Sequence, residues 1–296
     1  MLTVFSTPKP FNGHSSVIQR NALKSWTLLH PDVEVILFGD EEGTAEACKD
    51  LDIRHEPQVR RNEYGTKYLN YIFDRARELA SHKILCYANC DIMLTSDFRS
   101  ALELVSKAHR RFLIIGKRWD TEITAPWDFS RPDWQVQLRS RAQREGRQNG
   151  PSWVDYFCFS NDLYYQKMPP FLIGRNGWDP WLTWHAYNTG VPLIDASRAV
   201  LAVHQNHDYA YLKAGAVPLH KDAEVFHNWK LGHGPEWHYY TVKAATEQLV
   251  GGKLKPNRLS RFGPMQSRIV CALDWIWFSF LKITRPIRHP LGIRRA

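Results

Sequence analysis

The stretch "HKILCYANCDIMLTSDF", residues 82 to 98, contains the feature on which the fold assignment depends. An apolar strand is expected from Ile84 to Ala88, and it continues directly into Asn89, Cys90 and Asp91. A second apolar triplet, residues 92 to 94, follows at once. The sequence therefore places a carboxylate directly after a strand, and this position needs a chemical explanation.

The composition is that of a folded protein with a large core. The chain has 296 residues, of which 44% are hydrophobic and 13% aromatic, so a disordered or collagen-like protein is excluded. Five cysteines are irregularly spaced without a CxxC pair, and the N-terminus "MLTVFSTPKP" lacks the basic and apolar regions of a signal peptide. We therefore expect a reducing, cytoplasmic environment.

The net charge of +9 is concentrated at the C-terminal end of the chain. Ten of the 39 lysines and arginines, but one of the 30 acidic residues, lie after residue 252, so residues 1–252 carry 29 charges of each sign. A neutral body has no electrostatic footprint for nucleic acid, and we expect no nucleic-acid partner. The same division predicts two parts, a body of residues 1–252 and a basic tail of residues 253–296.

Short apolar strands alternate with helical segments along the body, which is typical of an α/β protein. Strands are expected in "LTVFS", "VEVILF" and "KILCYA", with helical segments between them. Each strand ends in a polar loop, at residues 7–12, 39–43 and 89–91. Open α/β sheets bind ligands at the edge formed by the C-terminal ends of their strands, so Asp91 is expected at a ligand-binding edge.

This order of elements, with "FGDEEG" at the end of the second strand and "CYANCDIML" spanning the third, resembles the nucleotide-sugar-binding half of the GT-A glycosyltransferase fold. The hallmark of that fold is a DxD motif after an apolar strand, and here Asn89, Cys90 and Asp91 stand in its place. The resemblance covers roughly residues 1–215 and implies a GT-A-like α/β domain with a mostly parallel central sheet. It also implies a nucleotide-sugar donor. Neither a GxGxxG motif nor a P-loop motif is present to indicate another kind of nucleotide site.

The resemblance further implies a divalent cation, Mn or Mg, which is held by hard carboxylate oxygens and neutralises charge on a departing diphosphate. Asp91 is the candidate ligand from the motif, and Asn89 is expected to contact the ribose or a metal-bound water. His204 and His207 follow a later apolar strand in "AVLAVHQNHDY", and by similarity they are candidates to complete the metal site. In the alternative interpretation Asp91 only caps the following turn, and the histidines lie in the acceptor cleft or on the surface.

The candidate general base lies in "FLIGRNGWDPWLTWHA", residues 171–186. Asp179 before Pro180 is typical of an N-cap followed by proline at the first helical position. The segment resembles the motif of inverting GT-A enzymes whose carboxylate takes the proton from the acceptor hydroxyl, which implies that role for Asp179. The second candidate is Asp155, in an otherwise apolar strand of residues 154–159. An unpaired buried carboxylate is costly, so we expect Asp155 to pair with an arginine or lysine or to face the ligand cleft.

Further contacts follow from the resemblance by order along the chain alone. Thr7, Asp40 and Lys67 match positions where GT-A enzymes contact the base, the ribose or the diphosphate. Aromatic side chains stack on the apolar faces of sugar rings, so Trp153 and Trp178 are candidates for binding a carbohydrate acceptor. Core packing explains such tryptophans equally well.

The predicted function is metal-dependent transfer of a sugar from a nucleotide-sugar donor to a hydroxyl of a glycan or lipid-linked acceptor. One alternative is a catalytically silent carbohydrate-binding or scaffold protein on the same fold, which the missing first aspartate suggests. The other is a sugar nucleotidyltransferase, which would normally carry a glycine-rich basic loop after the first strand. The corresponding segment here, "STPKPFNGHSS", has one glycine.

The tail contains an apolar run of fifteen residues, from Ile269 to Ile283, which is shorter than the roughly 20 residues that span a bilayer. On a helix its polar positions share one face, with tryptophan and phenylalanine among the others and arginines at both ends. This pattern predicts an amphipathic helix that binds anionic lipids at the cytoplasmic, inner face of a membrane. Packing on the body or a dimer contact is the alternative.

Overall fold

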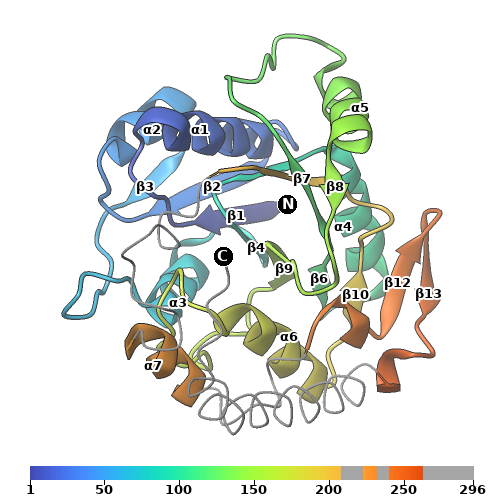
Figure 1. Ribbon diagram of the computed structural model, residues 1–296. Coiled ribbons are helices and arrows are strands. Elements are labelled where there is room, and N and C mark those ends of the chain that lie inside the picture. The colour runs from blue at the N-terminus through green and yellow to red at the C-terminus, as the bar shows by residue number, and fades with distance from the viewer. Residues whose placement is uncertain (208–222, 232–239, 263–296) are drawn as a thin grey trace, which may run out of the picture.

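The computed structural model, which describes residues 1–207, 223–231 and 240–262, has an α/β fold around a nine-stranded sheet (Figure 1). The strands lie in the order β13-β12-β10-β6-β9-β4-β1-β2-β3. Their bounds are β1 (Leu2–Ser6), β2 (Val33–Phe38), β3 (Arg54–Glu56), β4 (Ile84–Ala88), β6 (Leu113–Ile115), β9 (Tyr156–Ser160), β10 (Leu193–Asp195), β12 (Glu247–Val250) and β13 (Lys253–Pro256). Neighbouring strands are parallel except in the pairs that involve β9 or β13. The predicted α/β class with a mostly parallel central sheet is confirmed.

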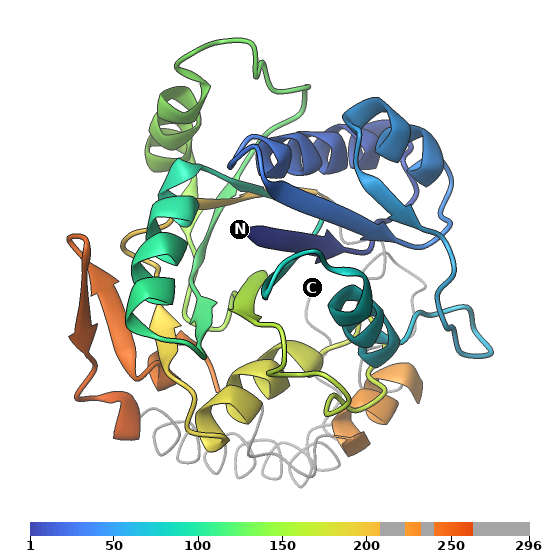
Figure 2. The same cartoon turned by 180° about the vertical axis from the view of Figure 1, so that it is seen from behind.

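Helices cover both faces of this sheet (Figures 1 and 2). One apolar core includes Trp26 and Phe98 from two helices packed against Val4, and the core on the opposite face includes Phe73 and Trp181. Burial from both sides explains why the strands are continuous apolar runs rather than alternating patterns. The helices are α1 (Gly13–Thr27), α2 (Thr44–Leu51), α3 (Leu69–Leu79), α4 (Ser96–Ala108), α5 (Trp134–Glu145), α6 (Trp178–Asn188) and α7 (Ala223–Leu231).

A second, four-stranded sheet joins distant parts of the chain. Its order is β5-β11-β7-β8, with β5 (Ile92–Leu94), β7 (Arg118–Thr121), β8 (Arg147–Gln148) and β11 (Ala202–Gln205). β11 pairs antiparallel with β5, where His204 is opposite Ile92, and parallel with β7, where His204 is opposite Asp120. β5 begins one residue after Asp91, so this pairing brings Asp91, Asp120 and His204 to one place.

β9 is antiparallel to both of its neighbours, β4 and β6. Its first residue, Tyr156, is opposite Ala88, the last residue of β4. The start of β9 therefore lies at the same edge of the sheet as the end of β4, and Asp155 is beside Asn89. The strand was expected from residue 154, whereas Asp155 precedes the strand and is not part of it.

Two further sequence expectations concern the ends of elements. α6 begins at Trp178 with Gly177 as its N-cap, so the prediction of Asp179 as N-cap was wrong, and Asp179 is the second residue of the helix.

The predicted division after residue 252 falls in the turn between β12 and β13, and the first residues of the tail belong to the sheet. The predicted amphipathic helix, residues 269–283, lies outside the described residues. Within the described residues, none of the helices combines the length and apolar character needed to cross a membrane.

Candidate functional site

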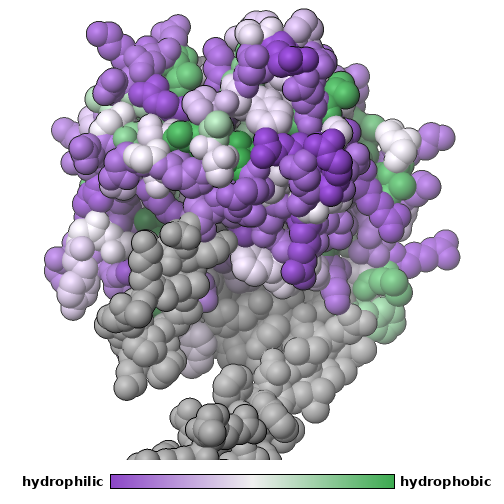
Figure 3. All heavy atoms as spheres, turned by 45° about the horizontal axis from the view of Figure 1, so that its top comes forward, coloured by the Kyte–Doolittle hydropathy of each residue, from purple (hydrophilic) through white to green (hydrophobic). Residues whose placement is uncertain are grey.

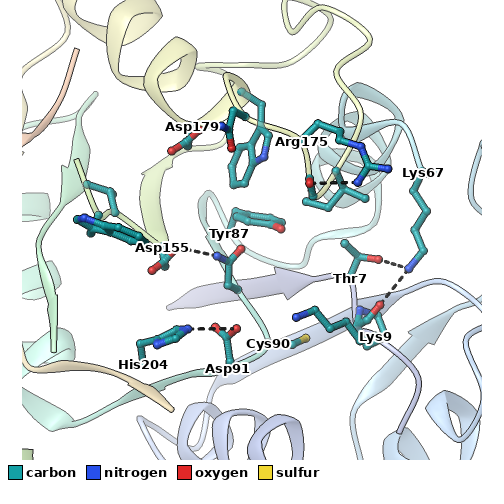
Figure 4. Close-up of a pocket in the computed structure, with 18 of the residues that line it drawn as sticks. Thr7, Lys9, Lys67, Tyr87, Cys90, Asp91, Asp155, Arg175, Asp179 and His204 are labelled. Carbon is teal, nitrogen blue, oxygen red and sulfur yellow. Dashed lines mark hydrogen bonds and ion pairs between the residues drawn. The ribbon is translucent and has the colours of Figure 1, made fainter. Parts of the chain in front are cut away.

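A cavity of about 860 Å³ opens at the edge of the sheet where β1 and β4 end and β9 begins (Figure 4). The segments that line it include the loops after β1 and β4, the loop before β9, residues 173–180 at the start of α6, and His204 and His207 at the end of β11. Glu41, Lys67 and Arg118 line it as well. The face of the molecule shown in Figure 3 is largely hydrophilic where it is coloured. The expectation that the polar loops gather at one edge of the sheet is therefore met for all three loops, since Glu41 brings the loop after β2 to the cavity as well.

Three predicted metal ligands lie together at one end of the cavity. The Nε2 atom of His207 is 3.0 Å from the Oδ2 atom of Asp91, and the Nε2 atom of His204 is 3.7 Å from the same oxygen. One ligand atom from each of the three residues lies within 4.8 Å of the others. The second carboxylate oxygen of Asp91, Oδ1, is buried and has no hydrogen-bond partner among the described residues. One carboxylate and two imidazoles with an unsatisfied buried oxygen fit a divalent cation such as Mn²⁺.

The electrostatics of this cluster favour the ligand form of Asp91. Burial alone would raise its pKa, but the hydrogen bond with His207 and the electrostatic interactions with His204, His207 and Lys9 lower the pKa to about 2. The carboxylate is therefore ionised at neutral pH, as a metal ligand must be.

Asp155 and Asn89 lie beside this cluster and contact each other. The Nδ2 group of Asn89 donates a hydrogen bond of 2.7 Å to Oδ1 of Asp155, and Nη1 of Arg118 donates one of 2.5 Å to Oδ2. Burial raises the pKa of Asp155, and the charge of Arg118 opposes this effect. Asp155 was expected either to pair with a basic residue or to face the cleft, and it does both.

Asp179 lies across the cavity from Asp91 (Figure 4). Gly177 has a φ angle of 115°, which glycine adopts readily and other residues rarely do. Gly177 lies in the turn that precedes α6, and Asp179 lies in the first turn of the helix. Burial raises the pKa of Asp179 to about 7, despite hydrogen bonds from backbone N–H groups at the helix start that act in the opposite direction. A carboxyl with this pKa can accept and release a proton near neutral pH.

Lys67 and Thr7 lie on the side of the cavity away from Asp179. The Nζ atom of Lys67 is 2.6 Å from Oε2 of Glu41 and donates a hydrogen bond to the hydroxyl of Thr7. The side chain of Lys67 is only 4% exposed, so the carboxylate of Glu41 compensates a buried charge. Lys67 and Thr7 both line the cavity, as expected for donor contacts.

Asp40 is the predicted site residue that the structure does not bring to the cavity. Its side chain is 68% exposed and paired with Arg61, and it is absent from the residues that line the cavity. The next residue, Glu41, lines the cavity instead. The acidic run "DEE", residues 40–42, predicts that a carboxylate lies near the site, but it does not indicate which of the three side chains faces the cavity.

The two tryptophans proposed for the acceptor differ in exposure. Trp153 is 48% exposed, lines the cavity, and has the guanidinium of Arg118 4.7 Å from its ring centre. Trp178 is 7% exposed and packs edge-on against Tyr87, with ring centres 5.3 Å apart. Trp153 is therefore about half exposed, with the Arg118 guanidinium over its ring, whereas most of Trp178 belongs to the core.

Helix α7 holds the loop that leads to Asp179. Asn228 is fully buried, and its amide accepts a hydrogen bond from the backbone N–H of Leu172 and donates one to the carbonyl of the same residue. Glu224 pairs with Arg175 in this loop and accepts a hydrogen bond from Asn62, which lies near Lys67 in the chain. The two sides of the cavity are thus connected through one helix.

Four further residues at or beside the site were not predicted from the sequence. Lys9, Arg118 and Arg175 line the cavity, and Asp120 contacts His204 from the neighbouring strand. "PKP" and "GRNG" mark loops around Lys9 and Arg175, so their position in loops was a usable signal. Arg118 and Asp120 lie in a short strand that pairs with β8 and with β11, and the pairing with β11, more than eighty positions away, brings Asp120 to His204. No local pattern identifies these two residues.

Comparison with known proteins finds similarity at the level of solved structures. No family model matches the chain, and no curated protein matches it. The chain is similar to glucosyl-3-phosphoglycerate synthase from Mycobacterium tuberculosis in complex with Mn²⁺, uridine diphosphate and phosphoglyceric acid, with 13% identity and a TM-score of 0.46 over 79% of this chain and 79% of that chain. It is also similar to residues 1–349 of TarS from S. aureus in complex with UDP-GlcNAc, with 9% identity and a TM-score of 0.45 over 72% of this chain and 61% of that chain. Both similarities concern the arrangement of helices and strands.

Proposed function

We propose that this protein is a metal-dependent glycosyltransferase, which moves a sugar from a nucleotide-sugar donor to a hydroxyl group. The observation that carries the proposal is the placement of a cation site and a carboxyl with a pKa of about 7 on opposite sides of one cavity. Transfer of a sugar requires stabilisation of the departing diphosphate and removal of a proton from the attacking hydroxyl. The two ends of this cavity offer groups suited to these two tasks.

Mn²⁺ or Mg²⁺ would be held by Asp91, His204 and His207. When bound, such a cation neutralises negative charge on a diphosphate leaving group. Lys9 extends toward Cys90 and Asp91 in the cavity, and its positive charge contributes to the low pKa of Asp91 (Figure 4). We therefore assign to Lys9 a direct contact with the diphosphate, beside the cation.

The nucleoside end of the donor is proposed to lie near Thr7 and Lys67. Lys67 is held rigidly by Glu41, Thr7 and the carbonyl of Pro8, which is 3.3 Å from its Nζ atom. A lysine fixed in this way presents a charge with little loss of side-chain entropy on binding. Asn89, whose Nδ2 group is engaged by Asp155, has its carbonyl oxygen left to accept a hydrogen bond from a donor hydroxyl.

Asp179 is proposed as the general base of an inverting transfer. Its pKa of about 7 allows it to take a proton from the acceptor hydroxyl as that oxygen attacks the anomeric carbon. Asp155 is the weaker candidate because both of its oxygens are already engaged, one by Asn89 and one by Arg118. Binding of donor-sugar hydroxyls is the role that suits Asp155 better.

The acceptor is proposed to be a glycan or a lipid-linked sugar. Trp153 is a half-exposed aromatic residue at the cavity, and the C–H face of a sugar ring can stack on an aromatic side chain of this kind. Trp178 is proposed to contribute an edge to the same region. The basic, aromatic tail of residues 253–296 supports a peripheral position on the cytoplasmic face of a membrane, where a lipid-linked acceptor would be within reach.

Titration calorimetry with a set of nucleotide sugars, each with and without Mn²⁺, tests the proposal. We expect one nucleotide class to bind tightly with Mn²⁺ and weakly in its absence, and the purified protein to hydrolyse or transfer that donor until EDTA is added. Metal-dependent binding without turnover toward any hydroxyl acceptor would favour a silent carbohydrate-binding or scaffold protein. Formation of a nucleotide sugar from a sugar phosphate and a nucleoside triphosphate would favour a nucleotidyltransferase.

A further inference from the structure

Arg118 is a buried cation that joins the two sheets of the protein. Its side chain is 5% exposed, and it comes from β7 of the four-stranded sheet. Its Nε group donates a hydrogen bond of 2.8 Å to Oδ1 of Asp120, two residues along the same strand. Its Nη1 group reaches Asp155, the residue just before β9 of the nine-stranded sheet. The ring of Trp153 covers the guanidinium.

Asp120 extends this line of contacts to the cation site. The same oxygen that accepts the bond from Arg118, Oδ1, lies 3.2 Å from Nδ1 of His204, although the ring N–H does not point straight at it. The register of β7 and β11 places Asp120 and His204 directly opposite each other. Asp120 therefore approaches the ring nitrogen of His204 that faces away from Asp91.

At its other end the line of contacts returns to the loop that carries Asp91. Asp155 holds Asn89 through the 2.7 Å hydrogen bond, and Asn89 precedes Asp91 by two residues. The contacts thus run from His204 through Asp120, Arg118 and Asp155 to Asn89, and they enclose Asp91 between the two ends. The carboxylates of Asp120 and Asp155 and the guanidinium of Arg118 together carry a formal charge of −1 next to the cation site.

A histidine that binds a metal through one ring nitrogen commonly donates the N–H of its other nitrogen to a carboxylate, which fixes the tautomer and the ring orientation. We propose that Asp120 and Arg118 are positioning residues of the cation site. Asp120 keeps His204 as the Nδ1–H tautomer with Nε2 free toward Asp91. Arg118 holds Asp120 and Asp155 in place, and through Asp155 it keeps the neutral Asn89 beside Asp91. This inference rests on the cation site of the proposed function.

The competing explanation is that Arg118 and its carboxylates only hold the two sheets together. In that case their removal would lower stability without changing the cation affinity of the protein that remains folded. The affinity of the folded protein for the cation therefore distinguishes the two explanations, and it can be measured without any turnover.

The first experiment measures Mn²⁺ binding to the full chain by titration calorimetry, with the free Mn²⁺ signal in electron paramagnetic resonance as a second readout. Asp120→Asn should weaken Mn²⁺ binding by about 10- to 100-fold, the usual effect of losing such a carboxylate. Asp97→Asn is the matched control, because Asp97, like Asp120, pairs with an arginine, in this case Arg139. Asp97 lies close to β11, where it accepts a hydrogen bond from the backbone N–H of Leu201. It makes no contact with His204 that the structure records, and its Mn²⁺ affinity should equal that of the wild type.

Equal Mn²⁺ affinity in Asp120→Asn and the wild type would overturn the inference. A wild-type protein that binds no Mn²⁺ would instead overturn the proposed cation site itself, so the two failures are distinguishable.

The second experiment needs neither metal nor a variant of Asp120, and it applies even if that variant does not fold. Long-range ¹H–¹⁵N correlation spectra of the metal-free protein report the tautomer of each histidine ring, and His204→Gln assigns the signal of interest. We expect His204 to carry its proton on Nδ1. A proton on Nε2 would overturn the inference. Arg118→Lys keeps the charge but lacks the planar fork, so it should shift the His204 signal less than Asp120→Asn does.

Discussion

Replacing Asp179 with asparagine should make the protein more stable in neutral and alkaline solution. Burial raises the pKa of Asp179 from 3.8 to about 7, so the folded protein keeps a proton on this carboxyl where the unfolded chain has lost it. The free energy of unfolding falls as pH rises wherever the folded state binds more protons, which here is the range from about pH 4 to pH 7. Below this range aspartic acid and asparagine are both neutral. Above it only aspartate has an unfavourable buried charge.

The size of the effect follows from the two pKa values. A shift of about three units at about 1.36 kcal/mol per unit gives about 4 kcal/mol, which is a ceiling because Asp179 borders an open cavity. A domain of this size changes its melting temperature by about 2–4 °C per kcal/mol. Asp179→Asn should therefore melt up to about 8–16 °C higher than the wild type at pH 8, and at about the same temperature at pH 4.

Thermal unfolding of the ligand-free proteins, followed by circular dichroism from pH 4 to pH 8, measures this difference. Asp162→Asn is the control, because that side chain is 60% exposed, and its melting temperature should stay within about 2 °C of the wild type at every pH. The same stabilised variant should lose about 10²- to 10⁴-fold in turnover with donor affinity nearly kept. A difference in melting temperature that is the same at pH 4 and pH 8 would refute the raised pKa, and with it the physical reason for preferring Asp179 as the base.

Three further predictions follow from the site and the tail. Asp91→Ala should weaken Mn²⁺ binding by at least about 100-fold, and it should weaken donor binding only when Mn²⁺ is present, both measured by calorimetry. If donor binding depended on Mn²⁺ as strongly in the variant as in the wild type, Asp91 would not be a metal ligand. Asn228→Ala removes the side-chain partners of the buried backbone groups of Leu172, so it should lower the free energy of unfolding by about 1–3 kcal/mol in chemical denaturation. It should also lower turnover more than donor affinity, and a loss confined to donor affinity would contradict the link between α7 and Asp179. A chain that ends at Phe262 keeps β13 and should bind donor normally but fail to sediment with anionic liposomes at low salt, whereas equal sedimentation of both chains would disprove membrane binding by the tail.

The parts of the site that could be predicted are those tied to the end of a strand. Asp91 follows a buried strand, and this alone places it at the ligand edge of a parallel sheet. Asp155 could be flagged because an ionised group among apolar residues needs a partner, and the structure supplies Arg118. In both cases a few neighbouring residues along the chain are enough for the prediction.

The parts that could not be predicted depend on pairing between distant strands or on the direction of a loop side chain. Asp120 reaches His204 through the pairing of β7 with β11, and nothing near Asp120 in the chain indicates it. Asp40 and Glu41 both follow β2, but beyond the end of a strand the alternation of side chains no longer applies, and Glu41 is the one that faces the cavity. The start of α6 was misplaced because proline suits the whole first turn of a helix, where the backbone N–H groups have no helical partner.

The separation of the metal ligands along the chain has a consequence for the rates of folding and unfolding. Asp91 and His207 are 116 positions apart, and in the fold they meet beside the strand β11, which pairs with both β5 and β7. Contacts between such distant residues form late, after the entropy of closing a long loop has been lost. Interactions absent from the transition state slow unfolding and leave the folding rate nearly unchanged. Mn²⁺ should therefore lengthen the lifetime of the folded protein without helping it to fold, and a newly synthesised chain would gain nothing from the cation until residue 207 had left the ribosome.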